Sequence, residues 1–197
     1  MMERSCGRVS RVGLHVTPLW VVAAVAALMF VSAAIAQDRS FSEYSVKAAF
    51  LYILPDFVVW PNSPPHQSTL TLCVLGDDPF GASLDFFEGK QVKNRTLRIV
   101  QLSGEASLHD CEILFISKSA ADQTRRILAP IARSPVLTVG EAREFTRNGG
   151  VVALLLVGDQ VQLEINVSAA RAAGLSISSK LLKMAHVVDF PSVQEPR

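Results

Sequence analysis

The amino-acid sequence predicts an α/β fold: a three-layer αβα sandwich with a mostly parallel sheet and an antiparallel C-terminal hairpin. Segments with strand and helix patterns alternate over most of the chain, which is the order of βαβ units. Ile113–Ile116 is apolar at every position, as in a central strand covered on both faces. Residues 151–166 hold two apolar runs separated by Gly158 and Asp159, which predicts a hairpin.

The first predicted element is a helix that begins near residue 40. Ser40 and Glu43 have the spacing of a capping box, in which two side chains satisfy free backbone amides. Large apolar residues then recur every three or four positions, at Val46, Phe50, Ile53, Phe57 and Trp60. Because Pro55 cannot donate a backbone hydrogen bond, we expect a kink or break there. A polar, proline-rich loop over residues 62–68 follows.

The middle of the chain contains strands and short helices in alternation. The predicted strands are Leu70–Leu75, Thr96–Leu102, Ile113–Ile116 and Val136–Val139. The predicted helices are Phe80–Glu88, Ser119–Ala129 and Glu141–Arg147. The carboxyl ends of the strands should therefore lie at one edge of the sheet, where α/β folds place their sites.

The segment from Val161 onward predicts the end of the fold. Val161, Leu163 and Ile165 alternate with polar residues, as in a half-buried strand. Asn166 is a suitable helix N-cap and Gly174 a suitable stop. A second short helix is expected from apolar residues at helical spacing, namely Leu181, Ala185 and Val188. The hairpin should then form an edge of the sheet, closed by two packing helices.

Residues 1–36 have the three parts of a secretory signal peptide. Three arginines lie in the first 11 residues, Leu19–Val31 is an apolar run, and Ala34 and Ala36 fit the small-residue cleavage rule. An uncleaved anchor is the alternative, although a membrane span needs about 20 apolar residues. We therefore expect export to the periplasm with cleavage after Ala36.

Residues 37–197 then form the mature chain, which we assign to a single domain. The whole chain has a formal net charge of +1. Removal of three arginines and one glutamate with the signal peptide changes this net charge to −1. Because no basic excess remains, we expect no nucleic-acid partner.

Two cysteines, Cys73 and Cys111, remain in the mature chain. An isolated pair in an oxidising compartment usually forms a disulfide, whereas in a reducing compartment the same residues would be small buried hydrophobes. The signal peptide favours the disulfide, and Cys73 and Cys111 lie on or next to strands that can be neighbours.

The sequence offers no arrangement that indicates catalysis. Asp77 and Asp78 precede Pro79 and are interpreted as turn residues. Ser117 follows the central strand without a base nearby in the sequence, so we interpret it as a hydrogen-bonded strand end. The mature histidines, His66, His109 and His186, lack metal-ligand spacing. We therefore expect a non-enzymatic protein without a cofactor or metal ion.

Several stretches resemble the YfiR family of periplasmic proteins, in order along nearly the whole mature chain. They are Lys47–Tyr52 with Trp60-Pro61, Leu72–Gly81, Cys111–Ser117, Pro135–Gly140, Gly149-Gly150, Leu163–Asn166 and Ile177–Lys183. The segment Ile53–Asp56 departs from the family pattern because it contains a proline.

The resemblance implies a regulator that binds other proteins. A YfiR-type repressor binds the periplasmic sensor domain of an inner-membrane diguanylate cyclase, and its release raises cyclic-di-GMP and favours biofilm growth. An OmpA-type outer-membrane lipoprotein can sequester such a repressor. Two other functions remain open: a periplasmic small-ligand-binding protein and a structural accessory protein of the envelope.

A repressor of this kind needs exposed anchor residues. Glu164 and Gln162 are candidates because, at a sheet edge, they would flank backbone groups able to pair with a partner or form a homodimer. The other candidates each have a structural interpretation as well: Trp60 as core, Asn166 as cap, and Lys180 and Lys183 as solvated charges. Glu164 is therefore the first residue to test.

The signal-peptide interpretation makes a direct prediction. Mass spectrometry of the exported protein should find Gln37 at its N-terminus, either unmodified or cyclised. An intact chain recovered from the membrane fraction would show that residues 1–36 are an anchor instead.

Overall fold

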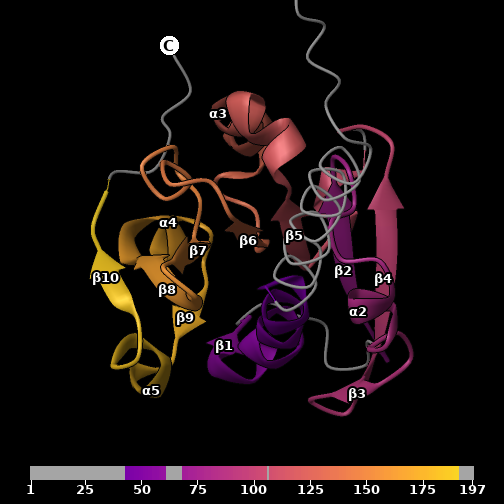
Figure 1. Cartoon of the computed structure of the whole chain (residues 1–197). Helices are drawn as coiled ribbons and strands as arrows, with labels where there is room; N and C mark the ends of the chain where they lie inside the picture. Colours follow the sequence, from indigo (N-terminus) through magenta and orange to yellow (C-terminus); the bar gives the residue numbers. More distant parts are fainter. Residues whose placement is uncertain (1–42, 61–67, 106, 191–197) are drawn as a thin grey trace, which may run out of the picture. The chain divides into compact units, whose positions relative to one another are not determined.

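One eight-stranded sheet organises the protein in its computed structural model, which describes residues 43–60, 68–105 and 107–190 (Figure 1). All these residues belong to the unit formed by residues 40–197. The strand order is β10-β8-β7-β6-β5-β2-β4-β3. The signal peptide, Ser40, most of the proline-rich loop and the tail after Phe190 lie outside the described residues.

The strands are β2 (Thr69–Leu75), β3 (Gln91–Val92), β4 (Arg95–Leu102), β5 (Ile113–Ile116), β6 (Leu137–Gly140), β7 (Val152–Val157), β8 (Gln160–Asn166) and β10 (His186–Val188). The five strands from β4 to β7 pair in parallel. Antiparallel pairs flank this core, β3 with β4 and β8 with β7. The mixed α/β architecture, with its mostly parallel sheet and C-terminal hairpin, confirms the predicted fold class.

The two faces of the sheet belong to two separate hydrophobic cores. In β5, Ile113 and Phe115 join one core while Leu114 and Ile116 join the other. The first core includes the helix over residues 43–53 together with α2 (Ala82–Asp85) and α4 (Val167–Ala172). The second core lies under η3 (Lys118–Gln123), α3 (Thr124–Leu128) and η4 (Ala129–Ile131). Helical segments thus cover both faces, in three layers.

The first helix ends where its proline predicts. The α-helix stops at residue 53 and continues as η1 (Leu54–Phe57), with the proline in the first turn. The predicted apolar stripe does not coincide with the buried face, because Val46 and Ile53 are exposed while Ala48 and Leu51 are fully buried. The other three residues of the stripe, Phe50, Phe57 and Trp60, are partly buried against the first core. Periodicity alone therefore placed the centre of the buried face only in part.

Three predicted helices differ from the structure. Of the predicted helix Phe80–Glu88, only α2 (Ala82–Asp85) is an α-helix, and turns follow it. Ser119–Ala129 is helical, but as short 3-10 and α segments joined end to end. Residues 141–149 form turns rather than a helix. The Phe145 ring lies so close to Gly140 and Gly150 that a Cβ at either glycine would come within 2.2 Å of it. The chain must fold back around this ring, which a regular helix would not allow.

The C-terminal segment confirms the hairpin and the cap. Val157 pairs with Gln160 across a two-residue turn, and the Asn166 side chain accepts hydrogen bonds from the backbone amides of Ser168 and Ala169. Gly174, with a φ of +70°, ends the helix in the left-handed conformation.

The predicted second short helix is confirmed at Leu181 but not at Val188, and the predicted sheet edge is wrong. Only α5 (Ser179–Leu182) is helical, whereas Val188 lies in β10, which pairs in parallel with β8 at Glu164, Ile165 and Asn166. The hairpin is therefore not the edge of the sheet at Glu164. The segment between α4 and α5 contains β9 (Ser176–Ile177), which pairs with β1 (Val58–Val59) after the first helix.

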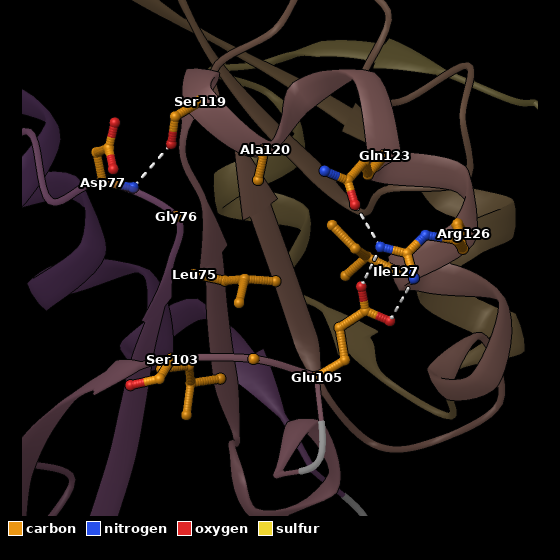
Figure 2. A pocket seen from close by; sticks show the side chains of 12 residues that line it. Leu75, Gly76, Asp77, Ser103, Glu105, Ser119, Ala120, Gln123, Arg126 and Ile127 are labelled. Carbon is orange, nitrogen blue, oxygen red and sulfur yellow. Dashed lines mark hydrogen bonds and ion pairs between the residues drawn. The ribbon is translucent and has the colours of Figure 1, made fainter.

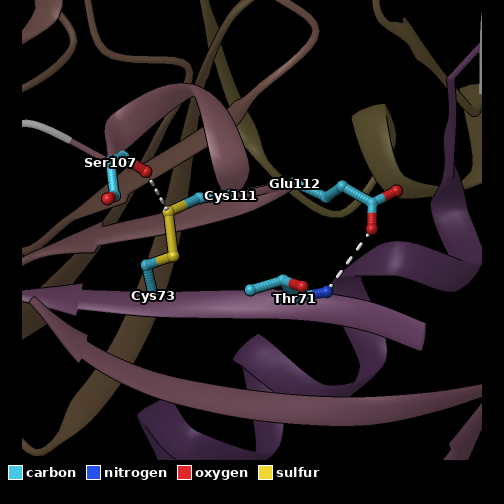
Figure 3. Close-up of a disulfide and its surroundings, with 5 residues drawn as sticks. All are labelled: Thr71, Cys73, Ser107, Cys111 and Glu112. Carbon is cyan, nitrogen blue, oxygen red and sulfur yellow. Dashed lines mark hydrogen bonds between the residues drawn. A yellow bond between two sulfur atoms is a disulfide. The ribbon is translucent and has the colours of Figure 1, made fainter.

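The predicted disulfide between Cys73 and Cys111 is confirmed (Figure 3). Cys73 lies in β2 and Cys111 just before β5, and their Cα atoms are 5.8 Å apart. Because β2 and β5 are adjacent, the bridge joins neighbouring strands in the second core. The Cys111 sulfur also lies 3.5 Å from the Ser107 carbonyl oxygen. Because a disulfide sulfur carries no proton, this contact is not a hydrogen bond.

We expect the bridge to stabilise the fold by restricting the unfolded chain. Closure of a 38-residue separation should contribute about 4 kcal/mol in the chain-entropy treatment. Urea denaturation of the Cys73→Ser/Cys111→Ser variant should show a loss of roughly that size. Thiol labelling of the denatured, unreduced protein should find neither cysteine reactive, and two reactive thiols would contradict the assignment.

Candidate functional site

The carboxyl ends of β2 and β5 meet where the strand order reverses, the usual ligand position of doubly wound folds. Gly76 follows β2 with a φ of +92°, and a Cβ there would lie 2.4 Å from Ser117 Oγ and 2.6 Å from Ser119 Oγ. The two serine hydroxyls are 2.9 Å apart, and Ser119 Oγ accepts a hydrogen bond from the Asp77 amide at 2.7 Å. The Ser117 and Ser119 hydroxyl groups therefore fill this crossing, the space between the carboxyl ends of β2 and β5.

An open pocket of about 800 Å³ lies beside this crossing, at the ends of β2 and β4 (Figure 2). Its polar side is formed by Arg126 and Glu105, whose charged groups are 2.7 Å apart, and by Gln123, which accepts a hydrogen bond from Arg126. Its apolar side includes Leu75 and Ile127. The pocket is lined by one cation, Arg126, and two anions, Glu105 and Asp77, and the cation pairs with Glu105.

A buried ion pair joins the first helix to the end of β6. Lys47 is 1 % exposed, and its ammonium lies 2.6 Å from the Glu141 carboxylate, which is also 1 % exposed. Lys47 also pairs with Glu43 one turn earlier. The other oxygen of Glu141 accepts a hydrogen bond from the Lys118 backbone amide at 3.1 Å. The only charged residues of the helix between residues 43 and 53 thus pair with each other and with Glu141.

This cluster also affects a tyrosine. Partial burial and the neighbouring Glu141 carboxylate raise the pKa of Tyr44 above its ordinary value. The Tyr44 hydroxyl, which is protonated at neutral pH in any case, therefore keeps its proton to a higher pH than an ordinary tyrosine and can donate a hydrogen bond. It lies next to a carboxylate that already has a lysine partner, so the cluster connects elements rather than exposing a reactive group.

Other residues singled out in the sequence have structural roles. Asp78 accepts a hydrogen bond from the Phe80 amide at 2.8 Å, which confirms its interpretation as a turn residue. The Ser117 hydroxyl is hydrogen-bonded, as interpreted. His109 contacts the Ser134 hydroxyl at 3.1 Å. Within the described ranges, no three His, Cys, Asp or Glu residues come together in a way that could hold a metal ion.

The candidate interface residues on β8 occupy different environments. Glu164 has a side chain only 17 % exposed, accepts a hydrogen bond from the Thr146 hydroxyl, and lies 4.0 Å from His186 Nε2. Gln162 is exposed and lies on β8 beyond the residues that pair with β10. Asn166 is fully buried as the helix cap, so its side chain does not reach the surface. A substitution at Gln162 should therefore disturb the fold less than one at Glu164. Gln162 is the better position at which to test this face as an interface.

The remaining candidates lie on the other side of the sheet. Trp60 packs against the first core, to which the inward β8 residues Leu163 and Ile165 belong, and its indole nitrogen is buried without a hydrogen-bond partner in the described structure. The Lys180 ammonium lies 5.9 Å from the centre of the Phe57 ring, and Lys183 is exposed at the end of α5. Gln162 and Glu164 face away from this core. The six candidate residues do not form one surface.

The fold and its strand ends define a single-lobed α/β domain whose buried charges and hydroxyl groups connect its own elements. Residues 44–186 match the model of the YfiR/HmsC-like family, and the chain belongs to this family. The family consists of non-enzymatic periplasmic regulatory proteins, and its members are associated with cyclic-di-GMP signalling. No curated protein matches the sequence significantly.

Two solved structures show a distant likeness in shape. One is an ABC domain from Streptococcus pneumoniae in complex with L-Trp, with 11% identity and a TM-score of 0.49 over 74% of this chain and 60% of that one. The other is a conserved domain protein from Vibrio cholerae, with 11% identity and a TM-score of 0.48 over 73% and 59% of the two chains. The aligned part spans about 60% of the length of each of these proteins.

Among the helices in the described ranges, none has the length and hydropathy that a membrane crossing requires.

The ion pair between Lys47 and Glu141 predicts a large and specific stability effect. Lys47→Met leaves a buried carboxylate without its closest cation, so it should cost about 3–5 kcal/mol in the free energy of unfolding, measured by urea denaturation. The matched control is Lys118→Met, because the Lys118 ammonium lies 3.9 Å from the same carboxylate but is 60 % exposed. It should cost less than about 1 kcal/mol. Equal losses in the two variants would refute the special role of the buried pair.

Proposed function

We propose that the protein binds the periplasmic sensor domain of an inner-membrane diguanylate cyclase and represses the cyclase. Membership of the YfiR/HmsC-like family supports this role. An OmpA-type outer-membrane lipoprotein that sequesters the protein would then relieve repression. In this scheme the protein performs no chemistry, and its contribution is an exposed surface that a partner recognises.

The outward face of the first helix is the observation that carries a protein-binding role. Val46 is 43% exposed, Ile53 is 40% exposed, and Ala49 lies between them on the side opposite the buried Ala48 and Leu51. A surface helix normally presents polar residues to solvent, and a helix that is apolar all round is normally buried. This face therefore suits an apolar surface of a partner, without charged groups that would have to be desolvated.

A second surface lies on the opposite side of the sheet. On the outer face of β7 and β8, Gln162 is exposed opposite the partly buried Leu155, and Val157 is 46% exposed next to them. His186 on β10 is exposed and pairs in register with Glu164. We therefore keep Gln162 and Glu164 as candidate partner contacts on this mixed surface, although Glu164 does not lie at an open sheet edge.

Binding of a small ligand is the second candidate function, and the pocket at the ends of β2 and β4 favours it. The pairing of Arg126 with Glu105 there means that an ionic ligand would have to compete with an existing contact. Copurification of a stoichiometric small molecule with the exported protein would favour this function over the first.

An affinity pulldown from detergent-solubilised membranes tests the proposed function. The wild-type protein should capture a membrane diguanylate cyclase and lower its product formation. Ile53→Lys places a charge in the apolar helix face and should weaken capture at least tenfold, a change of about 1.4 kcal/mol in binding free energy. Failure to capture any cyclase would contradict the function itself.

Two further variants raise the net charge by one, as Ile53→Lys does, and show which of the two surfaces binds the partner. Gln162→Lys tests the β7–β8 face, and an unchanged affinity would exclude that face. Asp85→Asn lies on an exposed position of α2 and serves as the control, which should bind like the wild type. Melting temperatures must match the wild type for each comparison. If Ile53→Lys also binds normally, the helix face is not the interface.

A further inference from the structure

Three short segments that are far apart in the sequence form one continuous surface: residues 54–60, 86–93 and 176–184. They include β1, β3 and α5, which Figure 1 shows in the lower part of the view. β1 pairs with β9, which joins the first segment to the third. The Lys93 ammonium donates a hydrogen bond to the Val58 carbonyl at 2.6 Å, which joins the second segment to the first. We call this surface the lysine face.

The face carries four of the six lysines in the chain, namely Lys90, Lys93, Lys180 and Lys183. Three of these lysines have their ammonium groups near aromatic rings. The Lys90 ammonium lies 3.2 Å from the centre of the Phe86 ring. The Lys93 ammonium lies 5.9 Å from the centre of the Trp60 ring. Such lysines cover apolar surface with their aliphatic stems and keep their charged groups in water.

The lysine face is positively charged in a chain that is not basic as a whole. Its acidic residues are Asp56 and Glu88, and the Glu88 carboxylate already accepts a hydrogen bond from the Ile99 amide at 2.6 Å. Four lysines and two acids give the face a formal net charge of +2, whereas the net charge of the mature chain is −1. The whole-chain charge therefore concealed a local basic surface.

The same face holds the most exposed large hydrophobic side chains of the described ranges. Phe86 is 66% exposed, Met184 is 65% exposed and Val59 is 55% exposed, one from each segment. Single exposed hydrophobic residues are common, but several gathered on one surface mark a site of protein or membrane interaction.

We propose that the lysine face docks on the anionic phospholipid surface of a membrane that borders the periplasm. The exposed side chains of Phe86, Met184 and Val59 enter the boundary between headgroups and acyl chains. The lysines reach the surrounding phosphates, which flexible stems can follow without a fixed geometry. This proposal goes beyond the proposed function, because it uses neither the first helix nor the hairpin and needs no cyclase.

The residue types favour a lipid surface over an acidic protein. Lysine is depleted at protein interfaces relative to the rest of the surface, whereas arginine is enriched there. All four cations of this face are lysines. Clusters of basic residues next to insertable apolar side chains are typical of proteins that lie on anionic membranes.

Vesicle cosedimentation tests the proposal with protein purified from the periplasm. One set of vesicles contains phosphatidylcholine alone, and the other contains equal parts of phosphatidylcholine and phosphatidylglycerol. Binding should be at least tenfold stronger to the anionic vesicles and should weaken as salt is added. Failure of the wild type to bind the anionic vesicles, or equal binding to both sets, would overturn the proposal. The first result would leave an acidic protein as the occupant.

Paired variants locate the contact. Lys180→Gln/Lys183→Gln should bind anionic vesicles at least tenfold more weakly, because each basic residue near such a surface contributes about 1 kcal/mol, or about fivefold. Arg125→Gln/Arg143→Gln removes the same charge from two exposed positions that follow β5 and β6, and should bind like the wild type. Equal losses in the two variants, at unchanged melting temperatures, would refute the lysine face as the contact.

Trp60 provides a second, direct measurement. It is the only tryptophan in residues 37–197, and it lies on the lysine face. Anionic vesicles with brominated acyl chains should quench its fluorescence, since such quenching requires close contact. Phe86→Ser should bind these vesicles less strongly and show less quenching. Vesicle binding that leaves the Trp60 fluorescence unchanged would place the contact elsewhere and would overturn the proposal.

Discussion

Complete burial of the parallel sheet on both faces is the constraint on which the structure depends. In β5, no residue is more than 2% exposed, and successive side chains enter different cores. Each connection between two parallel strands must therefore place its helical segments on one face of the sheet or the other, and both faces must be covered. The first core is built from the first helix and α4, which lie far apart in the sequence. The disulfide strengthens only the second core, where the covering segments are short.

The buried Lys47 fixes the position of the first helix on this sheet. An apolar helix could slide along an apolar face with little loss of contact. A lysine that is 1 % exposed cannot, because its charge must meet Glu141 at the end of β6. Desolvation makes such a pair a weak source of net stability, but separation of the partners is costly. We therefore regard the pair as a determinant of register more than of stability.

Sequence periodicity was sufficient for most strands and for the order of the fold. Ile113–Ile116 is apolar throughout because it is central, and the hairpin at Gly158 follows from its turn residues. The turn over residues 141–149 could not be predicted, since it depends on the packing of Phe145 against two glycines. The orientation of the first helix was also hidden, because a buried lysine looks like a surface residue in the sequence. A lone lysine within an otherwise apolar helix was the available signal.

The C-terminal error has a similar origin. Leu181, Ala185 and Val188 have helical spacing, but three residues at this spacing are also compatible with a short helix followed by a strand. Pairing with β8 decides the outcome, because β10 covers backbone groups at Ile165 that would otherwise be unpaired. The same pairing places Glu164 within the sheet, where its carboxylate bonds to Thr146. The interface prediction for Glu164 was based on local pattern and could not anticipate this long-range contact.

The position where this topology usually binds ligands is here occupied largely by the protein's own groups. Ser119 satisfies the Asp77 amide, Glu141 satisfies the Lys118 amide, and Arg126 is paired with Glu105. Polar groups that already have partners gain little from a ligand, because each new contact must replace an existing one. Recognition is then better served by surfaces whose groups lack internal partners, such as the apolar face of the first helix.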